Sequence, residues 1–256
     1  MLLAIDVGNT NTKFALIEGG EIRHRWRLST DAKRTTDEYA VWLNQLMQLE
    51  GIERGQVTAA IISTVVPPTL FDLRRLCNKY YALEPMVVGA PGVDPGIRLA
   101  VDNPHAVGAD RIVTSSAAHH LYGGDAIVVG CGTATTFNVV VDGAYVGGAI
   151  APGINLSAEA LYMAAAQLPR IAIEPPPGDR ALAQGTIPSM QSGVFFGYVG
   201  LVEGLVRRIT SEMNRPARVI GTGGLAGLFS RHTEAIHVVD HDLMTRGLAL
   251  IHARNA

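Results

Sequence analysis

The feature that most constrains the fold is an internal repeat, because the second half of the chain begins as the first half does. Residues 1–17 contain two short apolar runs separated by a small polar turn around Gly8. Residues 126–141 repeat this pattern around Gly132, at an offset of 124 residues. The same offset pairs two more positions: Thr136 with Thr12, and Gly143 with Gly19. The repeat predicts two similar halves, each beginning with a strand, a turn and a strand.

The composition of the first turn is typical of a phosphate-binding site. A single carboxylate, Asp6, ends the first apolar run, and Lys13 begins the second. Glycine lets the backbone approach a ligand, and successive amides with Asn and Thr side chains can cradle an anion. Asp6 can hold a divalent cation at the strand end. The alternative is that this turn is an ordinary hairpin with a polar tip. If both repeated turns bind phosphate, they could face each other across a cleft and bind one phosphate chain from both sides.

Between the two repeated segments, helices and strands alternate, which predicts a mixed sheet with helices packed on it. Residues 35–38 resemble a capping box that opens a helix. Residues 89–109 are rich in Pro and Gly, and long loops of this kind are often functional. They lead to Asp110 and Arg111 at the start of a predicted helix. Asp110 either caps that helix or acts in a site, whereas Arg111 is unfavourable there and is expected to have an anionic partner.

The second half contains a long predicted helix over residues 190–213. Four glycines lie three or four residues apart on one stripe of it: Gly193, Gly197, Gly200 and Gly204. Each glycine inside a helix costs roughly 1 kcal/mol, so close approach of another backbone is expected to compensate. The approaching backbone belongs either to a neighbouring helix of the same chain or to a second subunit.

Composition excludes several classes of protein. The 256 residues have a net charge of -2, which gives no basic surplus for nucleic acid or an anionic membrane. The two cysteines fit a reducing cytoplasm, and no basic leader precedes an apolar stretch. The eight histidines show no zinc-like spacing with cysteine. We therefore expect a cytoplasmic protein that binds neither membrane nor nucleic acid.

Five segments together resemble the type III pantothenate kinases, of the acetate and sugar kinase/Hsp70/actin superfamily. They follow one another in the family's order along nearly the whole chain: residues 6–10, 108–111, 132–136, 147–153 and 222–224. The resemblance implies an α/β protein of two ribonuclease H-like (actin-like ATPase) domains, residues 1–115 and 116–256. Each domain would have a mixed five-stranded-type sheet with flanking helices, and ATP would lie between them.

The resemblance also implies an activity, the transfer of the γ-phosphate of ATP to the primary hydroxyl of pantothenate. The product, 4'-phosphopantothenate, begins the route to coenzyme A. Mg²⁺ or another divalent metal at Asp6, K⁺ or NH₄⁺, and a homodimer belong to this expectation, and Asp110 would be the general base. The implied pantothenate-binding residues are Val101, Gly108, Ala109, Arg111 and, across the dimer interface, Thr186. The implied ATP-binding residues are Asp6, Gly8, Asn9, Thr10, Lys13, Gly132, Thr133, Thr135 and Gly223.

The chain departs from the family pattern at several site positions. Gly130 stands where the family usually has an Asp associated with the metal or the monovalent cation, as the counterpart of Asp6. Asn138 stands where an Asp is common, Val101 where many members have Tyr, and Gln184 where Arg is common. The alternative function is therefore that of a weakly active or inactive nucleotide-binding relative with a regulatory role. A third possible function is that of a kinase of another small hydroxy acid or sugar.

Overall fold

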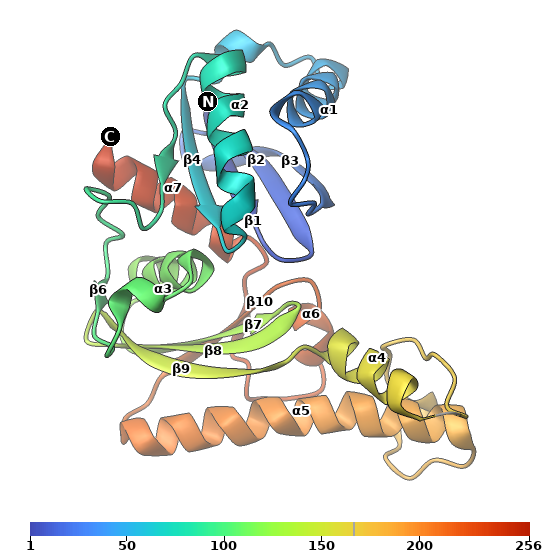
Figure 1. Ribbon diagram of the computed structural model, residues 1–256. Helices are drawn as coiled ribbons and strands as arrows, with labels where there is room; N and C mark the ends of the chain where they lie inside the picture. Colours follow the sequence, from blue (N-terminus) through green and yellow to red (C-terminus); the bar gives the residue numbers. More distant parts are fainter. Residues whose placement is uncertain (166) are drawn as a thin grey trace. The chain divides into compact units, whose positions relative to one another are not determined.

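The computed structural model describes residues 1–165 and 167–256. It divides into two compact units (Figure 1). The first unit comprises residues 1–121 together with the C-terminal residues 242–256, and the second comprises residues 122–241. None of the helices in the described residues is both long and apolar enough to cross a membrane.

The first unit is built on a five-stranded mixed sheet in the order β3-β2-β1-β4-β5. Strands β1, β2 and β3 are antiparallel neighbours, whereas β4 runs parallel to both β1 and β5. Its strands are β1 (Leu2–Val7), β2 (Asn11–Glu18), β3 (Glu21–Ser29), β4 (Ala59–Thr64) and β5 (Met86–Val87), and a short β6 (Arg98–Leu99) follows. Its helices are α1 (Thr36–Leu49), α2 (Leu70–Tyr81), α3 (Ala109–Tyr122) and α7 (Leu243–Asn255), with 3₁₀ turns η1 (Arg54–Gln56), η2 (Pro67–Thr69) and η3 (Pro104–Ala106).

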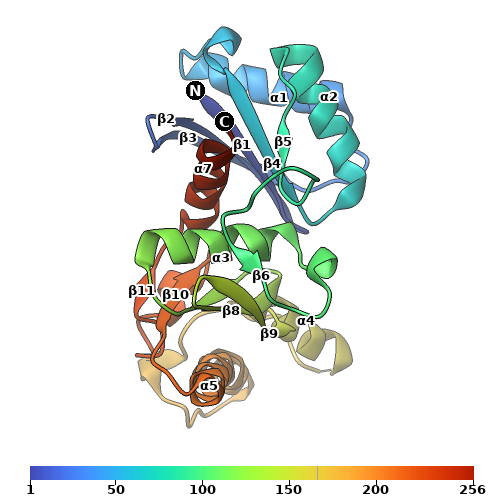
Figure 2. The same ribbon diagram turned by 90° about the vertical axis from the view of Figure 1, so that its left-hand side faces the viewer.

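Helices cover both faces of this sheet (Figure 2). Alternate residues of β1 and β2, such as Ile5 and Phe14, pack in a core with α1 and α2. Helix α7 contacts β1 and β4. It also packs closely on α3, because a Cβ atom at Gly247 would lie 2.7 Å from the carbonyl oxygen of Val113. The last helix therefore connects the strand that carries Asp6 to the helix that carries Asp110.

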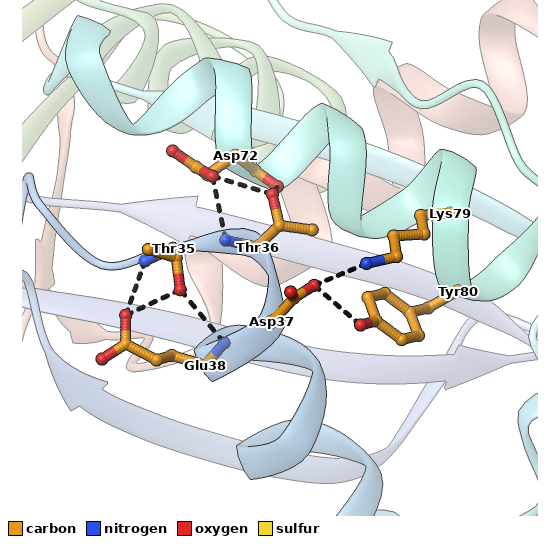
Figure 3. A network of polar contacts seen from close by, with 7 residues as sticks. All are labelled: Thr35, Thr36, Asp37, Glu38, Asp72, Lys79 and Tyr80. Carbon is orange, nitrogen blue, oxygen red and sulfur yellow. Dashed lines mark hydrogen bonds and ion pairs between the residues drawn. The ribbon is translucent and has the colours of Figure 1, made fainter.

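The predicted capping box at the start of α1 is confirmed. The Glu38 carboxylate accepts a hydrogen bond of 2.7 Å from the backbone N–H of Thr35, and the Thr35 hydroxyl accepts one from the N–H of Glu38 (Figure 3). Asp72 on α2 accepts hydrogen bonds from the amide and the hydroxyl of Thr36. The first turn of α1 is thus fixed to α2 as well as capped.

Five strands of the second sheet repeat the topology of the first, in the order β9-β8-β7-β10-β11. Strands β7, β8 and β9 are antiparallel neighbours, and β10 runs parallel to β7 and β11. Helix α5 packs along one face of this sheet (Figure 1). The strands are β7 (Ala126–Cys131), β8 (Ala134–Val141), β9 (Ala144–Pro152), β10 (Arg218–Thr222) and β11 (Val238–Val239). The helices are α4 (Ile154–Ala164), α5 (Thr186–Met213) and α6 (Ala226–Phe229), with a 3₁₀ turn η4 (Pro177–Asp179).

The structure confirms the repeat but corrects its register. Gly132 matches Gly8, as predicted, because β7 lies 124 residues after β1. The second turn is one residue shorter: Gly132 N–H bonds to Ala134, whereas Gly8 N–H bonds to Asn11. Beyond the turn the offset is therefore 123. Two pairs follow from this offset: Thr135 with Thr12, each fully buried, and Gly143 with Gly20, each with positive φ at a hairpin tip.

The predicted domains were residues 1–115 and 116–256, which placed the C-terminal residues in the second half. In the structure α7 instead packs within the first unit. The reason is its apolar face, which buries Leu243, Leu248 and Ile251.

Candidate active site

The first polar turn is held by a residue that sequence analysis did not single out. Thr30, just beyond β3, donates from its amide to the carbonyl of Thr10 (3.0 Å) and from its hydroxyl to the carbonyl of Gly8 (2.7 Å). Its hydroxyl also lies 3.0 Å from that of Thr12. Asn9 and Thr10 are exposed at the tip. The turn is consequently a fixed loop whose tip is open to a ligand.

Asp6 is the most strongly perturbed carboxylate of this region. Its side chain is 14% exposed, and the ammonium group of Lys13 lies 3.7 Å from its Oδ2 atom. Burial raises the pKa of Asp6 to about 6; the charge of Lys13 lowers this pKa and the charge of Asp110 raises it. The carboxylates of Asp6 and Asp110 therefore lie close enough to interact electrostatically.

Asp110 lies in the first turn of α3, and its carboxylate bends back over the start of the helix. Its Oδ1 atom accepts a hydrogen bond of 2.8 Å from the backbone N–H of Arg111. A Cβ atom at Gly108 would lie 2.7 Å from that oxygen, so a larger residue there would displace the Asp110 carboxylate. Arg111 donates to the carbonyl of Ala106 over 3.4 Å. The predicted segment 108–111 thus forms one structural unit at the helix start.

The loop before this segment is anchored by the end of the chain. The Asn255 side chain bonds to both backbone groups of Asp94, each over 2.8 Å, and Arg254 Nε lies 2.5 Å from an oxygen of the Asp94 carboxylate. The hydroxyl of Ser116 on α3 donates to the carbonyl of Pro95 over 2.6 Å. Val101 lies farther along this loop in a bend and is half-buried.

The second polar turn, in the second unit, is packed tightly by backbone. A Cβ atom at Gly153 would lie 2.4 Å from the carbonyl oxygens of Gly132 and Thr133, and one at Gly223 would lie 2.4 Å from that of Cys131. Gly132 and Thr133 are exposed at the tip. The buried Thr135 hydroxyl instead bonds to Tyr198 (2.8 Å) and to the carbonyl of Pro152 (3.1 Å). Thr135 therefore supports the turn from beneath.

Thr136 occupies the space beside Gly130, the counterpart of Asp6. The two residues pair across β7 and β8, and a Cβ atom at Gly130 would lie 2.7 Å from the Thr136 hydroxyl oxygen. A larger side chain at Gly130 must displace this hydroxyl, whose χ1 angle is restricted by β-branching.

We expect Gly130→Asp to destabilise the chain by about 1–3 kcal/mol, the usual cost of overpacking. Adding Thr136→Ala should recover most of that loss, because it removes the clashing hydroxyl. Urea unfolding of both single variants and the double variant measures the coupling, and the double variant should retain the activity of the starting chain. Additive losses would show that the two positions do not interact.

Thr186 lies in a different part of the second unit. It is the first residue of α5 and lines an open cavity of about 790 Å³ together with α4. The helix begins four residues before the predicted start at Met190, since Pro188 is tolerated in a first turn. The structure therefore pairs Asp6 with Lys13 and places Asp110 in the same unit, where its charge acts on Asp6. In the second unit Gly223 packs against Cys131, the residue before Gly132.

Comparisons with known proteins identify what this arrangement resembles. A family model described as type III pantothenate kinase matches residues 2–208. A type III pantothenate kinase of Rhodospirillum rubrum is 57% identical over 100% of this chain and 99% of its own length. Another, from Paramagnetospirillum magneticum, is 54% identical over 100% of this chain and 98% of its own length.

Solved structures share the fold at low sequence identity. A Campylobacter jejuni protein assigned to the Baf family of transcriptional activators has a TM-score of 0.62 and 18% identity, covering 99% of this chain and 98% of its own. A Porphyromonas gingivalis protein assigned as an N-acetylglucosamine kinase has a TM-score of 0.53 and 13% identity, covering 100% and 99%. These similarities support the predicted α/β architecture of two mixed sheets with flanking helices.

Proposed function

Because the chain belongs to the type III pantothenate kinase family, we propose that it transfers the γ-phosphate of ATP to the primary hydroxyl of pantothenate. The product is 4'-phosphopantothenate, and the reaction begins coenzyme A synthesis. The observation that best supports a catalytic chain is that the two predicted carboxylates, Asp6 and Asp110, interact electrostatically within the first unit, which raises the pKa of Asp6. Asp6 precedes the first polar turn, whose tip at Asn9 and Thr10 is exposed.

In this mechanism Asp110 is the general base. It accepts the proton of the pantothenate hydroxyl as that oxygen bonds to the γ-phosphorus and the bond to the ADP oxygen breaks. Its position at a helix start leaves one carboxylate oxygen for the substrate, since Oδ1 accepts the Arg111 amide. Arg111, Gly108, Ala109 and Val101 would line the pantothenate site. In the first unit, the exposed tip at Asn9–Thr10 and the side chain of Lys13 would contact nucleotide phosphates. In the second unit, the exposed tip at Gly132–Thr133 is its own candidate phosphate-binding turn.

The residues around Asp6 fit Mg²⁺. Mg²⁺ in kinases keeps several of its waters and is bound by one or two carboxylates together with substrate phosphates, so it does not require a full set of protein ligands. The described residues contain no cluster of three or more acidic, His or Cys side chains that could hold a metal ion. Ser63, beside Asp6 on β4, has a buried hydroxyl without a hydrogen-bond partner in the described chain. Asp6 would hold the ion, which when bound neutralises phosphate charge. Gly130 offers no carboxylate for K⁺ or NH₄⁺, so we assign no step to a monovalent cation.

We further propose a homodimer built on the outer face of α5. The glycine stripe lies opposite the buried residues of this helix, such as Val199 and Val202. Apart from the adjacent backbone of α5 itself, nothing in the described part of the chain lies within 4 Å of a Cβ atom at any of these glycines, so the intrachain alternative is not supported. Thr186 is exposed on the same helix, and large apolar side chains are exposed on α4, before α5 and in its first turn: Leu156, Met163, Leu182 and Ile187. A partner helix would cover them.

Gly197→Leu should convert the dimer to a monomer. The new side chain has open space in the isolated chain but would block a second helix backbone, and it removes a cost of roughly 1 kcal/mol for glycine in a helix. Light scattering after size exclusion measures the mass. Gln45→Leu, which adds the same side chain to an exposed position of α1, is the control. A dimer unchanged by Gly197→Leu would contradict this interface.

The test of the function is a turnover assay with ATP, pantothenate and Mg²⁺, with and without K⁺ or NH₄⁺. Formation of ADP and 4'-phosphopantothenate supports the kinase. ATP binding without turnover under every cation would favour a regulatory relative. Turnover only with other hydroxy acids or sugars would favour a kinase of a different substrate.

The cysteines Cys77 and Cys131 are buried free thiols, and we propose the cytoplasm as the compartment.

A further inference from the structure

A row of charged side chains crosses the first sheet at the level of Asp6. Strand register pairs Asp6 with Lys13, and Lys13 in turn with Arg27 on β3. Directly paired residues project from the same face of a sheet, and the ion pair between Asp6 and Lys13 agrees with this. Arg27 therefore lies on the face of the sheet that carries Asp6, one strand beyond Lys13.

Arg27 differs from the other arginines of its strand. Arg23, Arg25 and Arg27 alternate on β3 and so share one face. Arg23 pairs with Glu21 (2.9 Å), and Arg25 forms two hydrogen bonds of 3.0 and 2.6 Å with Asp242. Arg27 is exposed and has no ion-pair or hydrogen-bond partner for its side chain among the described residues. The two arginines farther from Asp6 are thus neutralised within the chain, whereas the one in register with it is not.

The residue that follows this strand also holds the first polar turn. Thr30, three residues after Arg27, accounts for the hydrogen bonds to the carbonyls of Gly8 and Thr10. The position of Arg27 relative to the turn is consequently fixed by the β2–β3 register and by Thr30. An unpaired arginine whose backbone is held in register beside such a turn is suited to a phosphate, which its guanidinium can bind through two parallel hydrogen bonds.

We propose that Arg27 binds a phosphate group of the nucleotide, as a residue of the ATP site beyond Asp6, the turn and Lys13. This inference rests on the proposed binding of ATP at the first turn. It does not depend on which alcohol accepts the phosphate. Arg27 supplies charge and orientation to the phosphate chain, and Lys13, which already faces Asp6, supplies a second cation.

Calorimetric titration with MgATP, in the absence of pantothenate, tests the proposal. Arg27→Met should raise the Kd for MgATP about tenfold, and Arg27→Lys should raise it less, because it keeps the charge but loses the paired hydrogen bonds. Arg25→Met is the matched control on the same strand and face, and its Kd should change less than twofold. In the kinase assay, Arg27→Met should raise the KM for ATP and leave the KM for pantothenate unchanged.

Each outcome decides between the possibilities. Equal effects of Arg27→Met and Arg25→Met, or a change below twofold for both, would overturn the proposal, as would a starting chain that does not bind MgATP. If the starting chain binds MgATP but phosphorylates no pantothenate, the proposed function fails while the titrations still decide the role of Arg27. Since Arg27 is exposed and unpaired in the described chain, thermal unfolding of Arg27→Met should match that of the starting chain.

Discussion

Replacing Asp110 by asparagine is expected to lower kcat about 10³-fold, because a positioned general base contributes roughly 10² to 10⁴ in rate. Asparagine keeps the shape of the side chain and an oxygen that accepts the Arg111 amide, so the start of α3 should persist. It cannot accept the substrate proton. Steady-state rates of ADP formation at saturating ATP and pantothenate measure the effect.

Binding measurements separate this loss from misfolding. The Kd for MgATP should change little in Asp110→Asn, and thermal unfolding should remain cooperative. Asp102→Asn, an exposed acid in the loop that precedes α3, is the matched control and should retain full activity. Retention of more than a tenth of kcat in Asp110→Asn would show that another group removes the proton, or that phosphoryl transfer here needs no base.

Local sequence signals predicted the parts of the fold that depend on a few neighbouring residues. The capping box at Thr35 and Glu38 encodes its own hydrogen bonds, and the structure contains both. The repeat was visible because each half must bury a strand, a turn and a strand in the same order. Its register beyond the turn was misassigned by one residue, because the sequence shift does not reveal that the second turn is shorter.

Long-range contacts at the site could not be predicted in the same way. Thr30 is an isolated threonine in the sequence, and only the β2–β3 pairing brings it to Gly8 and Thr10. Arg254 and Asn255 look like an ordinary polar helix end, and their role in anchoring Asp94 follows from the return of α7 to the first unit. Arg27 likewise becomes notable only through its register with Lys13.

Asp6→Asn is expected to abolish most activity and yet to stabilise the chain. Activity should fall about 10²-fold or more, because the variant loses the carboxylate proposed to hold Mg²⁺ and a catalytic metal contributes several kcal/mol. The stabilisation has a different cause. Burial raises the pKa of Asp6 from 3.8 to about 6, which means that the folded chain disfavours the charged form.

The sign of this effect fixes its pH dependence. Between pH 3.8 and about 6 the folded state holds the Asp6 proton while the unfolded state releases it, so this carboxyl lowers the free energy of unfolding as pH rises through that window. Above pH 6 the penalty is complete, at about 2–3 kcal/mol. Asparagine carries no charge at any pH and avoids the penalty.

The measurement is therefore the change with pH in the difference in unfolding free energy between the starting chain and the variant. Urea unfolding of the starting chain and of Asp6→Asn, without Mg²⁺ or nucleotide, should give a gap in unfolding free energy that grows by about 2–3 kcal/mol from pH 4 to pH 8. Asp102→Asn, which removes an exposed carboxylate, should show no comparable growth. A pH-independent gap for Asp6→Asn would mean that Lys13 and solvent fully compensate the buried charge. Asp6 would then be an ordinary surface carboxylate. A gap that grows as expected would show that the chain gives up stability to keep an anion at the first polar turn.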